Sequence, residues 1–153
     1  PYETSAAMAR MVFSGMFDKF PDLKVITHHA GGMIPYFEGR VGPGWDQMGA
    51  RTTDRDLKAE VLDKLKRPHL EYFKDFYADT ATFGSGRAIS HAMEFFGAYK
   101  VLFASDAPFD PEGGPMYIRE TMARIDALGL SEEARRAVYQ DNAVRLLGLT
   151  LEG

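Results

Sequence analysis

The fold is decided by the sequence Lys-Val-Leu-Phe-Ala-Ser-Asp-Ala-Pro at residues 100–108. Residues 100–105 form a short, mostly apolar run of the length of one buried strand. A strand of this kind is typical of a parallel sheet that is covered on both faces. Asp106 follows directly, where the strand ends. We therefore expect a parallel sheet with an acidic side chain at the carboxyl end of this strand.

Two further strands are predicted before this one, at residues 23–27 and 76–80. Helical patterns alternate with the strands and are expected at residues 5–20 (capped by Thr4 or Ser5), 33–40, 57–72 (broken near Pro68), 85–96 and 115–128, and in a last helix after Ser131. Residues 46–55 are read as a loop. Strands that alternate with helices indicate an α/β fold with right-handed crossovers.

Two of the predicted helices have a clear apolar face. The helix at 85–96 should turn inward the residues Ile89, Ala92, Met93 and Phe96, which follow helical spacing. In the last helix the predicted core face consists of Ala134, Val138, Ala143, Leu146 and Leu147.

Composition excludes several classes of function. The chain of 153 residues carries a formal net charge of −4, so it lacks the basic surface of a nucleic-acid or anionic-membrane binder. No apolar run approaches the roughly 20 residues that cross a bilayer. The absence of cysteine excludes disulfides, thiolate metal ligands and a cysteine nucleophile. The chain begins at Pro1 with no signal-peptide pattern, so we expect a cytoplasmic protein of which residues 1–153 are one piece.

Polar residues follow all three predicted strands. His28 and His29 follow the first, Asp79 ends the second, and Asp106 follows the third. Parallel α/β folds bind ligands at the carboxyl ends of their strands, so all of these are candidates. A histidine can act as a base or bind a metal, and an aspartate can ligate a divalent cation. The alternative is that these side chains only cap backbone groups, and for Asp79 we favour that structural role.

Other features carry less weight. Gly31-Gly32 would let a ligand approach the backbone closely beside the histidine pair. His69 and His91 lie on predicted helices and are expected to be surface or packing residues, and Trp45 is expected to pack in a core or interface. Neither a dinucleotide fingerprint nor a Gly-x-Ser-x-Gly elbow occurs.

Three stretches together resemble a known family. They are Phe-Pro-Asp-Leu-Lys-Val-Ile at 20–26 with His-His-Ala-Gly-Gly-Met-Ile-Pro-Tyr at 28–36, Leu-Phe-Ala-Ser-Asp-Ala-Pro-Phe at 102–109, and Asn-Ala-Val-Arg-Leu-Leu-Gly-Leu at 142–149. In this order they resemble the C-terminal half of the amidohydrolase-related metal-dependent decarboxylases and hydrolases, which include aminocarboxymuconate-semialdehyde decarboxylase and the resorcylate decarboxylases. The resemblance implies the C-terminal part of a (β/α)8 TIM barrel, about three β/α units plus C-terminal helices, in one partial domain over residues 1–153.

The resemblance also implies a site. His29 would be the catalytic acid and base, and Asp106 a catalytic residue that ligates or contacts the metal, normally zinc. Arg40 would bind the substrate carboxylate, across the interface of a homodimer, through two parallel hydrogen bonds. The implied substrate is a small carboxylated aromatic or unsaturated acid, and the implied reaction is decarboxylation.

The sequence also departs from the family. The His-x-His pair of the first barrel strand and the histidine of the fifth are not in this chain. Asp106 alone cannot hold zinc, which usually takes three protein ligands in a catalytic site. We therefore expect an incomplete metal site and no activity from this chain alone. Two alternatives remain open: a metal-dependent hydrolase of a lactone or amide, and a non-catalytic half-barrel that binds a partner.

Overall fold

The computed structural model describes residues 1–51 and 56–151. It contains a parallel sheet in the order β1-β2-β3. The strands are β1 (Ile26–Thr27), β2 (Tyr77–Asp79) and β3 (Val101–Leu102). Thr27 is in register with Ala78, and Asp79 with Leu102. The parallel α/β prediction is confirmed.

Each strand is shorter than its predicted segment, because neighbouring backbone groups bond to other partners. After β3, the Phe103 N–H donates to the carbonyl oxygen of Val138 at 2.9 Å rather than to a strand. The Thr80 hydroxyl bonds to both backbone groups of Ala104, donating to its carbonyl oxygen at 2.8 Å and accepting from its N–H at 2.9 Å. The ladder therefore ends early at its carboxyl edge.

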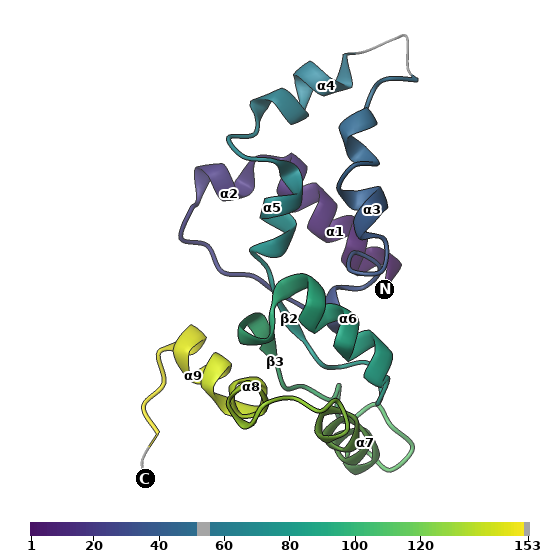
Figure 1. The fold of residues 1–153 in the computed structure, drawn as a ribbon, viewed down its shortest axis with the longest axis vertical. Coiled ribbons are helices and arrows are strands. Elements are labelled where there is room, and N and C mark those ends of the chain that lie inside the picture. Colours follow the sequence, from purple (N-terminus) through teal and green to yellow (C-terminus); the bar gives the residue numbers. More distant parts are fainter. Residues whose placement is uncertain (52–55, 152–153) are drawn as a thin grey trace.

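The strands lie near the middle of the molecule, and helices extend from them toward both ends of its long axis (Figure 1). They are α1 (Tyr2–Phe13), α2 (Met16–Lys19), α3 (Glu38–Val41), α4 (Leu57–Glu60), α5 (His69–Lys74), α6 (Gly86–Phe96), α7 (Pro115–Asp126), α8 (Glu132–Arg136) and α9 (Asn142–Leu147). In Figure 1, α1 to α5 lie above the strands, α6 lies alongside them, and α7 to α9 lie toward the bottom of the view.

Several predicted helices are divided. The helix expected over residues 5–20 begins earlier and breaks at Gly15, whose φ of 70° is left-handed. Thr4 therefore lies inside α1, where it is buried, and is not its cap. Residues 57–72 form α4, a short turn at Leu62–Lys64 and then α5, because Pro68 cannot continue a helix. Residues 52–55 of the predicted loop lie outside the described residues.

The predicted core face of the last helix is wrong at its end. A wide π turn at Ala137–Asp141 separates α8 from α9. Such a turn holds an extra residue and rotates everything after it about the helix axis. Val138 is buried as predicted, but Leu147 is 60% exposed and Asn142 takes the inward position instead.

An aromatic cluster joins α1, α5 and the short turn at Trp45–Gln47. Phe13, Phe73 and Trp45 pack edge-on or tilted, with ring centroids 5.0 to 6.1 Å apart. On α6 the predicted face is confirmed, since Ile89, Ala92 and Phe96 are buried and Met93 packs against them. Within the residues that the structure describes, no helix is both long and apolar enough to cross a membrane.

Candidate active site

The loops that leave the three strands share an unusual backbone. Each contains a non-glycine residue with positive φ: His29 (55°) and Ala30 (56°) after β1, Phe83 (54°) after β2, and Asp106 (66°) after β3. This conformation is uncommon for residues with a side chain, and it costs free energy unless the surroundings hold it. Strained residues at functional sites often serve to aim side chains. The strain here occurs where the sequence predicts the site.

His29 is held by its ring. Its Nδ1 lies 2.8 Å from the carbonyl oxygen of Ala81, in the loop after β2. A carbonyl oxygen can only accept, so Nδ1 carries the hydrogen and donates. The neutral ring then has its lone pair on Nε2. A histidine anchored in this way presents Nε2 to take up a proton or bind a metal.

Asp79 connects the first two loops. Its Oδ1 accepts hydrogen bonds from the N–H groups of Ala30 at 3.2 Å and Ala81 at 3.0 Å. Burial raises the pKa of the Asp79 carboxyl, and these hydrogen bonds and the nearby His29 offset part of the effect. The structural role that the sequence favours for Asp79 is confirmed, and the residues it braces flank or anchor His29.

Asp106 occupies the third loop. It is partly buried, and its carbonyl oxygen accepts from the Phe109 N–H at 3.2 Å. In residues 1–51 and 56–151, no hydrogen bond or ion pair engages the Asp106 carboxylate. Its role as a metal ligand stays a prediction.

The described residues do not form a metal site by themselves. Among them, no three His, Asp or Glu side chains come together in a group that could hold a metal ion. The donor set is too small for catalytic zinc, which usually has three protein ligands.

Arg40 lies apart from the strand exits. It is exposed on α3 and lines a surface hollow of about 330 Å³ with Tyr2, Phe37 and Trp45. Within the described ranges no hydrogen bond or ion pair connects its guanidinium to His29 or Asp106. Its assignment to a substrate in a neighbouring subunit stays a prediction.

The glycine pair is closely packed against other parts of the chain. A Cβ on Gly31 would lie 2.7 Å from Cζ of Phe96, and one on Gly32 would lie 2.6 Å from the carbonyl oxygen of Pro1. The space beside both glycines is therefore filled by α6 and by the start of α1. Close packing of protein explains why these two positions lack side chains, and the close approach of a ligand stays a prediction.

The other histidines have structural partners. His28 Nδ1 lies 3.1 Å from the Thr4 hydroxyl oxygen. His69 is buried, and its Nε2 donates to the carbonyl oxygen of Val41 at 2.8 Å. His91 is exposed on α6. These roles agree with the expectation for His69 and His91.

One residue beside the site escaped the sequence analysis. The Phe83 side chain is 50% exposed, and its ring centroid is 6.4 Å from that of His29. On its other side it stacks on Tyr117, with centroids 4.2 Å apart and planes inclined by 19°. The only local signal is the adjacent Gly84, a turn residue, which predicts a loop but not an aromatic wall.

A parallel sheet with a histidine and an aspartate on strained loops at its carboxyl edge is the arrangement expected of a (β/α) fold, in which ligand sites lie at that edge. The chain belongs to the Amidohydrolase family, whose sequence profile matches residues 1–149. The resemblance derived from the sequence is thereby confirmed.

Curated relatives are decarboxylases for the most part. The chain is 32% identical to 2-amino-3-carboxymuconate-6-semialdehyde decarboxylase of Dictyostelium discoideum, over 97% of this chain and 38% of that protein. It is 29% identical to 6-methylsalicylic acid decarboxylase of Penicillium expansum, over 95% of this chain and 41% of that protein. The chain thus spans about two fifths of the length of these relatives.

Solved structures of decarboxylases also match most of this chain and about two fifths of their own length. 5-Carboxyvanillate decarboxylase from Sphingomonas paucimobilis matches with a TM-score of 0.71 and 30% identity, over 94% of this chain and 39% of that one. A dihydroxybenzoic acid decarboxylase from Polaromonas, with bound manganese and 2-nitroresorcinol, matches with a TM-score of 0.73 and 26% identity, over 97% of this chain and 40% of that one. The chain is therefore part of a (β/α)8 barrel, as predicted.

Proposed function

We propose that the full-length protein containing this chain is a metal-dependent decarboxylase of a small carboxylated aromatic or unsaturated acid. The observation that carries the proposal is the anchored ring of His29, whose Nδ1 donates to Ala81 and whose Nε2 is left for chemistry. Relatives that act on 6-methylsalicylic acid and γ-resorcylate support the substrate class.

Each candidate residue has one task in this proposal. In the reaction the bond between ring carbon and carboxylate breaks, carbon dioxide leaves, and the ring carbon keeps the electron pair. His29 in its protonated form donates the proton that this carbon takes up. Arg40 of a neighbouring subunit holds a substrate carboxylate, which suits its exposed position on α3.

Asp106 is proposed as one ligand of a divalent metal whose other ligands come from outside the described residues. Such an ion polarises substrate oxygens or lowers the pKa of bound water. Manganese in the Polaromonas relative supports a divalent ion, and zinc remains our proposal for its identity. A dimer located in the cytoplasm is also part of the proposal.

Paired histidine substitutions test the function. In the full-length protein, His29→Gln should reduce kcat for decarboxylation by at least about 100-fold, because it removes the proton donor. The adjacent His28→Gln is the matched control, since His28 bonds to the Thr4 hydroxyl of α1 rather than to the loop after β2. Carbon dioxide release from carboxylated aromatics is the readout. Equal activity of the two variants would contradict the role of His29.

Addition of water is the second candidate reaction. A 2-keto-4-carboxy-3-hexenedioate hydratase of Sphingobium is 26% identical over 92% of this chain. Hydrolysis of a lactone or amide, the other alternative, also uses an activated water molecule as the nucleophile. Incubation with an unsaturated carboxylic acid separates these possibilities, because hydration adds water without loss of carbon dioxide. A protein that catalyses none of these reactions would favour the non-catalytic half-barrel.

A further inference from the structure

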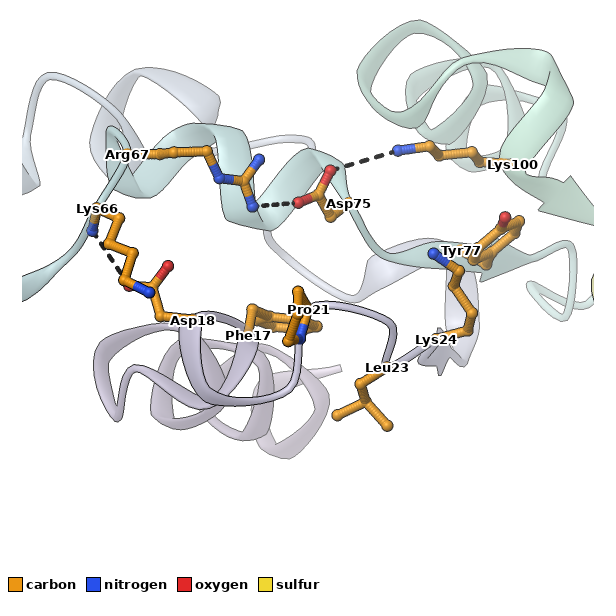
Figure 2. A pocket seen from close by; sticks show the side chains of 10 residues that line it. All are labelled: Phe17, Asp18, Pro21, Leu23, Lys24, Lys66, Arg67, Asp75, Tyr77 and Lys100. Atoms are coloured by element: carbon orange, nitrogen blue, oxygen red, sulfur yellow. Dashed lines mark hydrogen bonds and ion pairs between the residues drawn. The ribbon is translucent and has the colours of Figure 1, made fainter.

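A second hollow lies at the opposite edge of the sheet from the candidate active site. It has a volume of about 460 Å³ and opens near the amino ends of the strands (Figure 2). Lys24 lies two residues before β1, Tyr77 is the first residue of β2, and Lys100 directly precedes β3. A ligand in this hollow would therefore bind away from His29 and Asp106.

The hollow is positively charged in an acidic chain. Its walls contain four cations, Lys24, Lys66, Arg67 and Lys100, but only two carboxylates. The whole chain has a formal net charge of −4. The local excess of positive charge is therefore a property of this hollow and not of the composition.

Asp75 is already paired with two of the cations. Its Oδ2 accepts from Arg67 Nη2 at 2.6 Å, and its Oδ1 lies 3.8 Å from Lys100 Nζ. Lys100 Nζ also donates to the carbonyl oxygen of Lys74 at 2.6 Å. These contacts brace one wall of the hollow, as Figure 2 shows for Arg67, Asp75 and Lys100.

Asp18 is engaged on the facing wall. Its carboxylate accepts from the Tyr72 hydroxyl at 2.6 Å and from the backbone N–H of Lys66 at 3.1 Å. The hydrogen bond from Tyr72 lowers the pKa of Asp18, so this carboxylate is ionised at neutral pH. In the described part of the chain, the ammonium groups of Lys24 and Lys66 form no ion pair, although the charge of Lys66 also helps to lower the pKa of Asp18.

The two lysines stand at opposite ends of the hollow. Figure 2 shows Lys66 beside Asp18 at one end and Lys24 beside Tyr77 at the other. Between them the wall is partly apolar and includes Phe17, Pro21 and Leu23. Two positive charges at opposite ends of one hollow suit a ligand that carries an anionic group at each of its ends.

We propose that this hollow binds a small organic dicarboxylate. Its two carboxylates would lie against Lys24 and Lys66, and its apolar body against Phe17 and Pro21, which lie between the two lysines. The volume of about 460 Å³ is within the range of small-molecule sites, roughly 300–1,000 Å³. The site is independent of the proposed reaction, since it shares no residue with the strand exits.

Calorimetric titration of the 153-residue chain with terephthalate tests this proposal. Binding should saturate at one ligand per chain and weaken with added salt, because exposed charges are screened. Lys24→Gln and Lys66→Gln should each lower the affinity about three- to fivefold, the effect of removing one exposed ion pair. Lys64→Gln, an exposed lysine outside the hollow, is the matched control and should leave the affinity unchanged.

Two further ligands and one further variant make the result decisive. Benzoate and inorganic phosphate should bind more weakly than terephthalate, and His29→Gln should bind terephthalate like the wild type. Emission of the single Trp45, which packs against Phe13 and Phe73, reports that each variant is folded. The proposal is overturned by absent saturation, by equal affinity in the Lys24→Gln/Lys66→Gln double variant, or by phosphate binding as tightly as terephthalate.

Discussion

At the scale of single residues, Asp79 determines how the histidine loop is held. Its Oδ1 receives two backbone N–H groups, from Ala30 and Ala81, that lie on different loops. Burial of this carboxylate makes its negative charge unfavourable for folding. Its oxygen is nevertheless required as the acceptor for the two N–H groups. Removing the acceptor oxygen should therefore lower the stability more than removing the charge alone.

Asp79→Ala should lower the free energy of unfolding by about 1–3 kcal/mol, because it leaves two buried N–H groups without an acceptor. Asp79→Asn keeps an acceptor oxygen and should lose less. Urea unfolding of both variants at neutral pH measures the difference. A larger loss for Asp79→Asn than for Asp79→Ala would contradict the assignment of the bonds.

The pH dependence of Asp79 follows from the direction of its pKa shift. Burial raises the pKa of the folded carboxyl above its ordinary value of 3.8. A raised pKa stabilises the fold when the group is protonated, below 3.8, and this stabilisation is lost as the pH rises through the folded pKa. The stability of Asp79→Asn should therefore improve relative to the wild type as the pH rises from 3.8 toward neutrality. Urea unfolding at several pH values in this window is the measurement, and a constant difference would contradict it.

At the scale of elements, the histidine loop is positioned by its contact with α6. Gly31 has a φ of 79°, and a Cβ there would meet the Phe96 ring at 2.7 and 2.8 Å. The Phe96 side chain is itself buried, so it has little room to move. The loop and the helix therefore depend on a residue without a side chain at this point.

Gly31→Ala should lower the free energy of unfolding by about 1–3 kcal/mol, since it adds both an overpacked contact and an unfavourable φ. Gly39→Ala is the control. Gly39 lies inside α3 with nothing within 4 Å of an added Cβ, so alanine there should stabilise by about 0.5–1 kcal/mol. Thermal and urea unfolding of both variants measure the change in the free energy of unfolding that each substitution causes. Similar effects of the two substitutions would argue against the contact with α6.

At the scale of the whole molecule, the sheet and the site are both incomplete. In the described residues β1 and β3 pair only with β2, so each has an open edge that favours pairing with further strands. The candidate metal ligand Asp106 likewise has no companion ligands there. Both features agree with a chain that spans about two fifths of its relatives.

The 153-residue chain should hold far less than one equivalent of divalent metal. Purified chain would be incubated with zinc or manganese, dialysed against metal-free buffer and subjected to elemental analysis. The physical reason is that a single carboxylate from Asp106 binds such an ion only weakly. One ion per chain after dialysis, and its loss in Asp106→Ala, would contradict this expectation.

Much of the architecture was predictable from the sequence. The run at 100–105 and the alternation of strands and helices predict the parallel sheet, whose strands the structure places in the order β1-β2-β3. The placement of His29 and Asp106 after strands also follows, because carboxyl ends of parallel strands share one edge. The motifs were sufficient for the family, which the profile over residues 1–149 confirms.

Tertiary contacts decided the rest. The π turn at Ala137–Asp141 exposes Leu147 against its helical periodicity, because one extra residue rotates α9. The Asp79 bond to Ala30 spans 49 residues of sequence, and the packing of Gly31 on Phe96 spans 65. The hollow between Lys24 and Lys66 likewise exists only after folding. Local sequence determines which residues can form a strand or a turn, but contacts between distant segments determine where that element ends and what its side chains meet.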